Sequence, residues 1–164
     1  MRKAVRTIVI RGDKMLAMKR NKFGSEYYTL VGGKIDLGET PEQAIVREVK
    51  EETQLDLINP RLVFIEHAGD PFGTQYIYLS DIAADGEPQL DPGSVEKSID
   101  AMGQNRYDPQ WVQLSNLSKL PFRSETLKQA LLEAIGSGFS SEPKTIIPTE
   151  DIRYTSEVKK EVKS

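Results

Sequence analysis

The sequence predicts an α+β domain, an α/β/α sandwich in which a mixed β-sheet lies between helices. Short runs rich in Val, Ile and Thr alternate with turn residues, in the order of three strands, a helix, three strands and a second helix. The first helical segment also carries strong start signals. The length of 164 residues suits one domain of ordinary size. Hairpin strands separated by helices favour a mixed sheet that is covered on both faces.

The first expected elements are three strands. The opening two apolar runs are separated by a short Gly-Asp turn, which is typical of a β-hairpin. A polar loop and a third apolar run that stops at two glycines follow. The expected strands are 4–10, 15–18 and 27–31, and the expected turns and loops are 11–14, 20–26 and Gly32-Gly33.

The first helix is expected over 41–53. Thr40 can act as the N-cap, Pro41 suits the first helical position, and Gln43 completes a capping box with Thr40. Helical spacing places Ile45 and Val49 on one face, where they can pack against a core. Three glutamates share the other face, namely Glu48, Glu51 and Glu52.

The second half of the chain predicts a less regular series of elements. Two strands flank a Gly- and Pro-rich turn, and a long segment with little periodicity follows them. We expect strands at 61–67, 75–82 and 111–114, a long loop at 83–108, a short turn at 115–120 and a helix at 123–135 ended by Gly136 and Gly138. The composition then changes, so we divide the chain into a domain of residues 1–136 and a C-terminal appendage of residues 137–164, packed on the domain or on a partner.

Composition and charge exclude several classes of protein. The chain has no cysteine, one histidine (His67) and a formal net charge of −3 at pH 7. A disulfide framework, a thiolate metal site and a cysteine nucleophile are therefore excluded. The mild negative charge argues against nucleic acid as a partner. No apolar run approaches the ~20 residues of a membrane span or the pattern of a signal peptide, so we expect no membrane partner and a cytoplasmic location.

The chemistry of the chain is concentrated between Gly33 and Glu52. Like charges at helical spacing repel one another by a few tenths of a kcal/mol per exposed pair, so three glutamates on one face call for a compensating cation. Arg47, four residues before Glu51, can supply part of that charge. Mg²⁺ prefers oxygen ligands and commonly bridges carboxylates and a substrate phosphate. A Gly-rich loop next to these carboxylates therefore predicts a site for metal-bound phosphate, although Glu-rich helix faces are often only solvated surface.

The segment 33–55 resembles the signature of the Nudix hydrolase family, and residues 1–136 are similar to its small, MutT-like members. The matching residues are Gly33, Glu39, Arg47, Glu48, Val49, Glu51, Glu52 and Leu55. The chain departs from the signature at Gln54, where the family has a glycine, and Val31 stands where many relatives have proline. Since that glycine ends the helix, the departure concerns the helix end more than the catalytic groups.

The resemblance implies a Nudix fold, a monomer or homodimer, and metal-dependent hydrolysis of a nucleoside diphosphate linked to another group. It implies Mg²⁺ or Mn²⁺ bound by Glu48, Glu51, Glu52 and the carbonyl of Gly33. Bound metal can activate the attacking water and stabilise the leaving oxygen. Of the implied catalytic residues other than the metal ligands, Arg47 orients the glutamates and Glu39 supports them. The general base is a motif glutamate or a carboxylate of the long loop, with Glu96 as first choice and Asp100 and Asp108 as alternatives.

The substrate is a nucleotide-derived small molecule, and its class stays open. Overall size and the opening hairpin favour a MutT-like hydrolase that converts a nucleoside triphosphate to a monophosphate and pyrophosphate. Pro71 lies at an offset associated with ADP-ribose-cleaving members, which keeps an ADP-ribose or nucleotide-sugar pyrophosphatase as the alternative. Net charge counts against hydrolysis of RNA 5′ ends. The expected substrate contacts are Arg6, Arg20, Tyr28, Gly32 and Lys34, and only one of the adjacent Tyr27 and Tyr28 easily faces a cleft.

A protein of another class remains possible on the same fold. A catalytically silent module would bind a nucleotide without hydrolysing it. The complete set of glutamates argues against this function, since a silent relative is free to lose them. The departures at Gln54 and Val31 keep it open.

Overall fold

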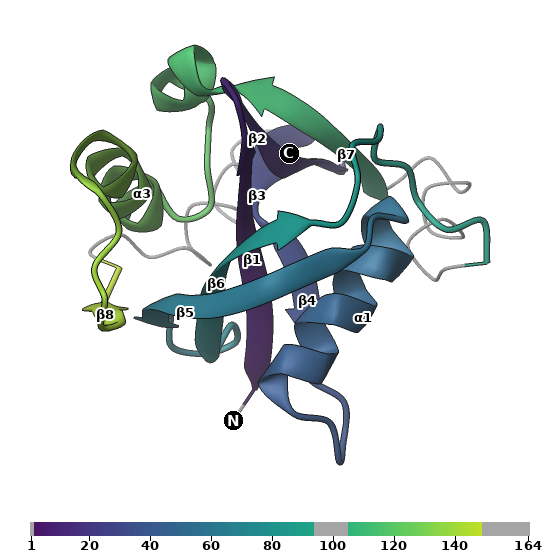
Figure 1. Cartoon of the computed structure of the whole chain (residues 1–164), viewed down its shortest axis with the longest axis horizontal. Helices are drawn as coiled ribbons and strands as arrows, with labels where there is room; N and C mark the ends of the chain where they lie inside the picture. Colours follow the sequence, from purple (N-terminus) through teal and green to yellow (C-terminus); the bar gives the residue numbers. More distant parts are fainter. Residues whose placement is uncertain (1, 94–104, 149–164) are drawn as a thin grey trace.

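The computed structural model describes residues 2–93 and 105–148 of the chain. A β-sheet lies in the middle of the molecule, with helix α1 on one side and helix α3 on the other (Figure 1). The predicted α+β class, a mixed sheet between helices, is confirmed. The elements are β1 (Lys3–Arg11), β2 (Lys14–Lys22), β3 (Ser25–Thr29), β4 (Val31–Lys34), α1 (Pro41–Thr53), β5 (Leu57–His67), β6 (Thr74–Ile82), β7 (Asn105–Gln113), the 3₁₀ helix η1 (Leu114–Lys119), α3 (Glu125–Ser137) and β8 (Lys144–Ile146).

Strand β1 is the centre of the sheet. The strand order is β3-β2-β1-β6-β5-β8, with β4 also paired to β1 and β7 also paired to β2. β1 runs parallel to β6 and antiparallel to β2 and β4. Its N-terminal half pairs with β4 and its C-terminal end pairs with β2. This arrangement brings the glycine-containing strand β4 next to the middle of the sheet, directly before the loop that leads into α1.

Two apolar clusters fill the spaces on the two sides of the sheet. Val5 and Val9 of β1 pack in the cluster that contains Ile45 and Val49 of α1. Ile8 of β1 packs in the other cluster, which contains residues of α3. The alternation of side chains along a strand explains why neighbouring residues of β1 enter opposite cores. Helix α1 is therefore fixed to the sheet by its apolar face, which leaves its glutamate face for β4 and solvent.

The strands before α1 differ from the prediction in two ways. Most of the expected loop 20–26 is strand, because β2 continues to Lys22 and β3 begins at Ser25 after a two-residue turn. The backbones of these polar residues pair with each other in the hairpin. The expected third strand 27–31 is two strands, separated at Leu30, and Gly32-Gly33 lie within β4 rather than ending a strand. Backbone pairing to β1 fixes these glycines, and composition alone does not reveal it.

Helix α1 begins and ends as its local sequence dictates. The capping box is confirmed: the Thr40 hydroxyl accepts from the Gln43 amide, and the Gln43 side chain accepts from the Thr40 amide. The helix ends at Thr53, and Gln54 takes a left-handed conformation with φ of 61°. Gln54 therefore adopts the left-handed conformation that the family's glycine would supply at the helix end. Its side-chain amide donates to the Leu90 carbonyl at 3.2 Å.

Strand β7 is longer than predicted, whereas helix α3 keeps the expected length of 13 residues and lies two residues later in the chain. β7 begins at Asn105, inside the expected loop 83–108, and pairs along its whole length with β2. Helix α3 continues through Gly136 to Ser137, and Gly138 is its C-cap. The described part of the expected appendage returns to the sheet, where β8 pairs in parallel with β5 and the Phe139 ring meets the Phe64 ring edge-on. The division into a domain 1–136 and an appendage 137–164 stays a prediction.

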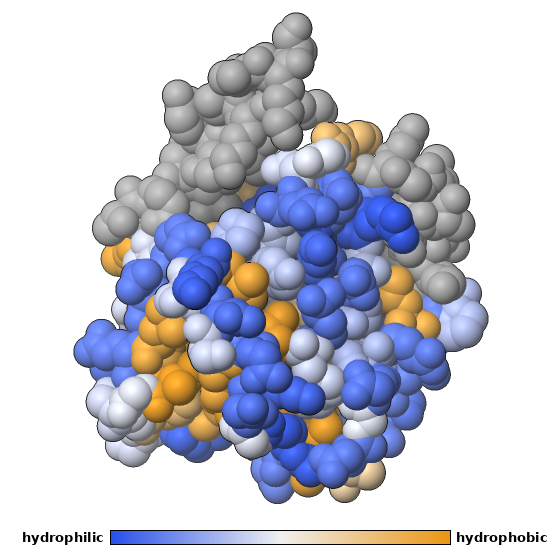
Figure 2. All heavy atoms as spheres, turned by 90° about the horizontal axis from the view of Figure 1, so that it is seen from above, coloured by the Kyte–Doolittle hydropathy of each residue, from blue (hydrophilic) through white to orange (hydrophobic). Residues whose placement is uncertain are grey.

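Figure 2 shows hydrophilic residues over much of the face seen there, with apolar residues gathered on the side where Figure 1 places α3. None of the helices in 2–93 and 105–148 is long and apolar enough to cross a membrane.

Candidate functional site

Helix α1 presents the three motif glutamates at different depths. The side chains of Glu48 and Glu52 are buried, and that of Glu51 is 41% exposed. Glu48 and Glu52 are one turn apart and face the sheet, whereas Glu51 lies toward solvent. Burying a carboxylate without a compensating partner costs folding free energy, so the groups that contact Glu48 and Glu52 determine how these side chains are held.

Strand β4 supplies the surface against which the buried glutamates lie. The amide of Gly32 donates to Oε2 of Glu52 at 3.3 Å. Gly32 has φ of 154°, and a Cβ there would lie 1.9 Å from the carbonyl oxygen of Val5, so only glycine fits. At Gly33, a Cβ would lie 2.6 Å from the carboxylate of Glu48. The glycine pair therefore lets the glutamates approach the strand backbone.

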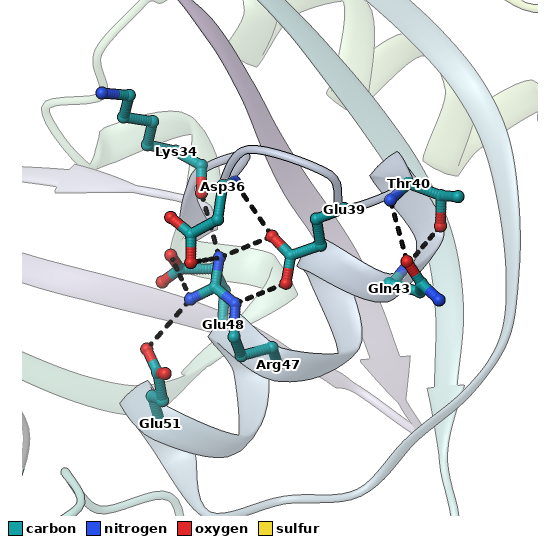
Figure 3. Close-up of polar contacts among 8 residues, drawn as sticks. All are labelled: Lys34, Asp36, Glu39, Thr40, Gln43, Arg47, Glu48 and Glu51. Carbon is teal, nitrogen blue, oxygen red and sulfur yellow. Dashed lines mark hydrogen bonds and ion pairs between the residues drawn. The ribbon is translucent and has the colours of Figure 1, made fainter.

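Arg47 joins the loop to the helix (Figure 3). Its guanidinium donates to both oxygens of Glu39, at 2.7 and 3.0 Å, and to the carbonyl oxygen of Lys34 at 3.1 Å. The same guanidinium donates from Nη1 to Glu48 at 3.0 Å and to Glu51 at 3.2 Å. One side chain thus orients two of the motif glutamates and holds the loop residue that precedes the helix.

The electrostatics of this cluster follow from its hydrogen bonds. The bonds from Arg47, then the backbone bond from Asp36, hold the pKa of the Glu39 carboxyl below its ordinary value. The bond to Glu39 in turn raises the pKa of Arg47. Glu39 is therefore a carboxylate at neutral pH, and it fixes the geometry of the loop, as Figure 3 shows.

The donor chemistry of the cluster fits a hard divalent cation. The glutamate oxygens of α1 lie against the backbone of β4, and Mg²⁺ and Mn²⁺ prefer such oxygen ligands. Within the described residues, however, no three carboxylates converge in a ligating arrangement, and Arg47 bonds both Glu48 and Glu51. The fit to a cation therefore concerns the chemistry of these oxygen donors and not their arrangement in the structure. The roles of these residues as ligands stay a prediction.

Arg6 lies on the other side of β4 from the glutamates. Its guanidinium donates to the carbonyl oxygens of Leu30 and Gly32 and to the side chain of Gln75. Burial lowers the pKa of Arg6, and the nearby negative charge of Glu52 opposes this effect. Arg6 is thus bound to the strand that carries the glycine pair, and its predicted role as a substrate contact is untested.

Three other residues predicted to contact the substrate lie in different surroundings: one lines a cavity, one packs in the core and one is exposed at the surface. Arg20 lines a small cavity near Arg6. The ring of Tyr28 stacks on Phe122 in the core on the α3 side, at 6.5 Å between ring centroids. Lys34 is exposed, and its ammonium points away from the carboxylates in Figure 3. Their contacts with substrate stay predictions.

The candidates for the general base lie mostly outside the described residues. Glu96 and Asp100 fall in the segment 94–104, which the structure does not describe. Asp108 is exposed on β7 and accepts a hydrogen bond from Gln110 at 3.0 Å. The choice of base remains open.

Sequence reasoning did not single out several polar residues near Arg6. Arg123 and Ser124 immediately precede α3, and Glu66 lies buried on β5. The Ser124 hydroxyl donates to Glu66 at 2.8 Å. The one signal in the sequence was Glu66, a charged residue within an apolar strand, because charged residues are seldom buried without a partner. Arginine and serine before a helix are common, so Arg123 and Ser124 gave no such signal.

The family model described as NUDIX domain matches residues 1–131. The chain belongs to the NUDIX domain family. The resemblance drawn from the sequence is thereby confirmed, and members of this family generally use divalent metal ions.

Sequence relatives are longer than this chain. The chain is 34% identical over 98 residues to the NAD-capped RNA hydrolase NudC of Pectobacterium atrosepticum, an alignment that covers 60% of the chain and 36% of that protein. The chain thus spans well under half the length of this curated relative. The hydrolase name of this relative supports the prediction of a pyrophosphohydrolase.

Solved structures share the fold. An ADP-ribose pyrophosphatase from Streptococcus suis superimposes with a TM-score of 0.61 at 21% identity, covering 88% of this chain and 98% of that one. The mutator MutT protein from Bacillus halodurans gives a TM-score of 0.60 at 19% identity, with 93% of each chain covered. At these identities the likeness concerns the fold alone.

Proposed function

We propose that this protein is a metal-dependent pyrophosphohydrolase that cleaves a nucleoside diphosphate linked to another group. The observation that carries the proposal is the meeting of the α1 glutamates with the backbone of Gly32-Gly33, organised by Arg47. A polyanionic substrate approaching acidic side chains requires a cation between them. Family membership supports the same chemistry.

Mg²⁺ or Mn²⁺ is the proposed cofactor. Glu48, Glu51, Glu52 and the carbonyl of Gly33 would hold it, and the bound metal would polarise the diphosphate and acidify a water molecule. Arg47 keeps Glu48 and Glu51 oriented through its two bonds from Nη1. Glu39 acts through Arg47, since its contacts are with the guanidinium and the loop backbone.

A nucleoside triphosphate is the proposed substrate class, hydrolysed to a nucleoside monophosphate and pyrophosphate. The guanidinium groups near β4 support a substrate with several negative charges. An ADP-ribose or nucleotide-sugar pyrophosphatase is the alternative within the same chemistry.

A panel of substrates tests the proposal. It contains common and oxidised nucleoside triphosphates, ADP-ribose, nucleotide sugars and dinucleoside polyphosphates, each with Mg²⁺, with Mn²⁺ and with EDTA. We expect metal-dependent release of monophosphate and pyrophosphate from a triphosphate. AMP from ADP-ribose would select the alternative. No cleavage of any substrate, by a folded protein that binds metal and nucleotide, would favour the silent module.

The variant Glu52→Gln tests the site. It keeps the size of the side chain and removes one negative ligand, so we expect turnover to be lost while the melting temperature stays near that of the wild type. Glu133→Gln, an exposed change on α3, is the matched control and should keep full activity. Activity of Glu52→Gln close to the wild type at saturating Mg²⁺ would refute the assignment of the metal site.

A second candidate is hydrolysis of an NAD-type dinucleotide at an RNA end, favoured by the name of the sequence relatives. The net charge of −3 counts against it. Cleavage of an NAD-capped RNA oligonucleotide at a kcat/KM above that for free triphosphates would select this function. Equal or lower values would leave the free nucleotide as the substrate.

A further inference from the structure

We propose that residues 86–91 form a strap that positions the last turn of α1 for metal binding, and that Trp111 and Gln54 are the positioning residues that hold this strap. The strap follows β6 and contacts both β7 and the C-terminal end of α1 (Figure 1). The last turn of α1 carries Glu51 and Glu52. The inference therefore rests on the metal site proposed above and names groups that act on it from outside.

Two backbone amides of the strap cap the C-terminal end of α1. The amide of Asp91 donates to the carbonyl oxygen of Glu51 at 2.9 Å. The amide of Gln89 donates to the carbonyl oxygen of Thr53 at 3.1 Å. The last four carbonyls of an α-helix have no partner within the helix, so they need donors from elsewhere. The strap supplies two such donors, and one of them bonds a residue that is itself a proposed metal ligand.

The strap also packs against the helix and the residues that follow it. The side chain of Leu90, which lies between the two donors, is buried in the apolar cluster that contains Val49 of α1. At the start of the strap, a Cβ on Gly86 would lie 3.2 Å from Cδ2 of Leu55, so the backbone there closely approaches the chain just after the helix. Packing therefore supports the strap near both of its ends.

Two side-chain donors from outside the strap hold its backbone. Nε1 of Trp111 on β7 donates to the carbonyl oxygen of Gly86 at 2.9 Å. Nε2 of Gln54 donates to the carbonyl oxygen of Leu90 at 3.2 Å. A glycine at position 54, as in the family signature, has no side chain that could make the second bond. The first bond ties the strap to the sheet, and the second ties it to the end of the helix.

The strap matters for the metal site because helix ends fray more readily than helix centres. It bonds the backbone at Glu51 and at Thr53, on either side of Glu52. When the strap is detached, the last turn frays and both glutamates leave their places. A cation then binds only the fraction of molecules in which the turn is in place, so its apparent affinity falls by that fraction.

The first measurement is amide hydrogen exchange of the metal-free protein, followed by NMR. The amides of Gln89 and Asp91 should be protected in the wild type, because both donate to the helix. They should lose most of this protection in Trp111→Phe, which keeps an aromatic ring and removes the donor to Gly86. Gln113→Ala, an exposed change on the same strand, is the matched control and should exchange like the wild type.

Isothermal titration calorimetry then measures Mg²⁺ binding without substrate. Trp111→Phe should bind Mg²⁺ about five-fold more weakly than the wild type, since groups that orient metal ligands commonly change metal affinity by such factors or more. Gln54→Gly should bind about three-fold more weakly although its free energy of unfolding hardly changes, because glycine adopts the left-handed conformation but lacks the bond to Leu90.

A destabilised control separates positioning from general stability. Leu131→Val removes one methylene group from the core on the α3 side and lowers the free energy of unfolding without touching the strap. Its Mg²⁺ affinity should equal that of the wild type. In the hydrolysis assay, saturating Mg²⁺ should restore the kcat of Trp111→Phe, because bound metal draws the last turn back into place. A kcat that stays low at saturating Mg²⁺ would contradict a role through metal binding.

Three further results would overturn the inference, and they differ from one another. Wild-type Mg²⁺ affinity in variants that have lost protection would show that the strap caps the helix without positioning the ligands. Protection that stays intact in both folded variants would show that Trp111 and Gln54 do not hold the strap. An absence of Mg²⁺ binding by the wild type would remove the proposed metal site itself, so failure of the proposed function is distinguished from failure of the strap.

Discussion

Replacing Arg47 with methionine tests whether the site is organised by one guanidinium. The substitution keeps much of the aliphatic stem and removes the bonds to Glu39, Glu48 and Glu51. A hydrogen bond to a charged group contributes about 1.5–3 kcal/mol, but exposed carboxylates recover much of this from water. Glu51 is 41% exposed, whereas the Glu48 side chain is 9% exposed and recovers least. We therefore expect the free energy of unfolding to fall by about 2–3 kcal/mol.

Urea denaturation at pH 7 in EDTA measures this change. Arg47→Lys keeps the charge but not the planar fork, so it should lose about half as much stability as the methionine variant. Lys50→Met on the same helix is the control, because its pair with Asp56 is largely exposed and contributes about 0.5 kcal/mol. A loss for Arg47→Met no larger than for Lys50→Met would refute the view that Arg47 holds the cluster together.

Other predictions concern the strand, the helix end and pH. Gly33→Ala should abolish turnover without unfolding the protein, since its Cβ would displace Glu48, and activity assays with circular dichroism check this. Gln54→Ala keeps a non-glycine residue in the left-handed conformation and loses the side-chain hydrogen bond to Leu90, so its free energy of unfolding, measured with urea, should fall by about 1 kcal/mol. The free energy of unfolding of Gln54→Gly should stay within about 0.5 kcal/mol of the wild type, because glycine adopts this conformation without strain. The pKa of Glu39 is lower in the folded protein than in the unfolded chain, so the ionised carboxylate stabilises the fold at pH values above the ordinary pKa of glutamate. This contribution is lost as the pH falls from that value through the lowered pKa of the folded state. The wild type should therefore lose more stability than Glu39→Gln between about pH 5 and pH 3, measured by denaturation across pH.

The parts of the molecule that the sequence predicted correctly are those with local causes. Helix α1 was predicted over its observed residues because Thr40, Pro41 and Gln43 act within one turn of each other. The shared face of the glutamates follows from helical spacing alone. The missing family glycine did not change the helix end, because Gln54 adopts the left-handed conformation itself.

The parts that the sequence could not predict depend on pairing between distant segments. Gly32-Gly33 looked like the end of a strand, and only the register with β1 shows that they continue it. The first residues of β7 looked like loop because they include polar residues and a proline, yet their backbone pairs with β2. Arg123 carried no signal, because its importance comes from the fold that brings it near Arg6 and Arg20.

Gly32 shows how the two polar networks depend on one backbone position. Its amide reaches Glu52 on the helix side, and its carbonyl reaches Arg6 on the cavity side. A side chain at this position would meet the carbonyl of Val5 at 1.9 Å, so any substitution would shift β4 relative to β1. Such a shift would disturb the approach to Glu52 and the seat of Arg6 together. Because the amide and the carbonyl of Gly32 serve one network each, the positions of the Glu52 carboxylate and of the Arg6 guanidinium both depend on this single residue of β4.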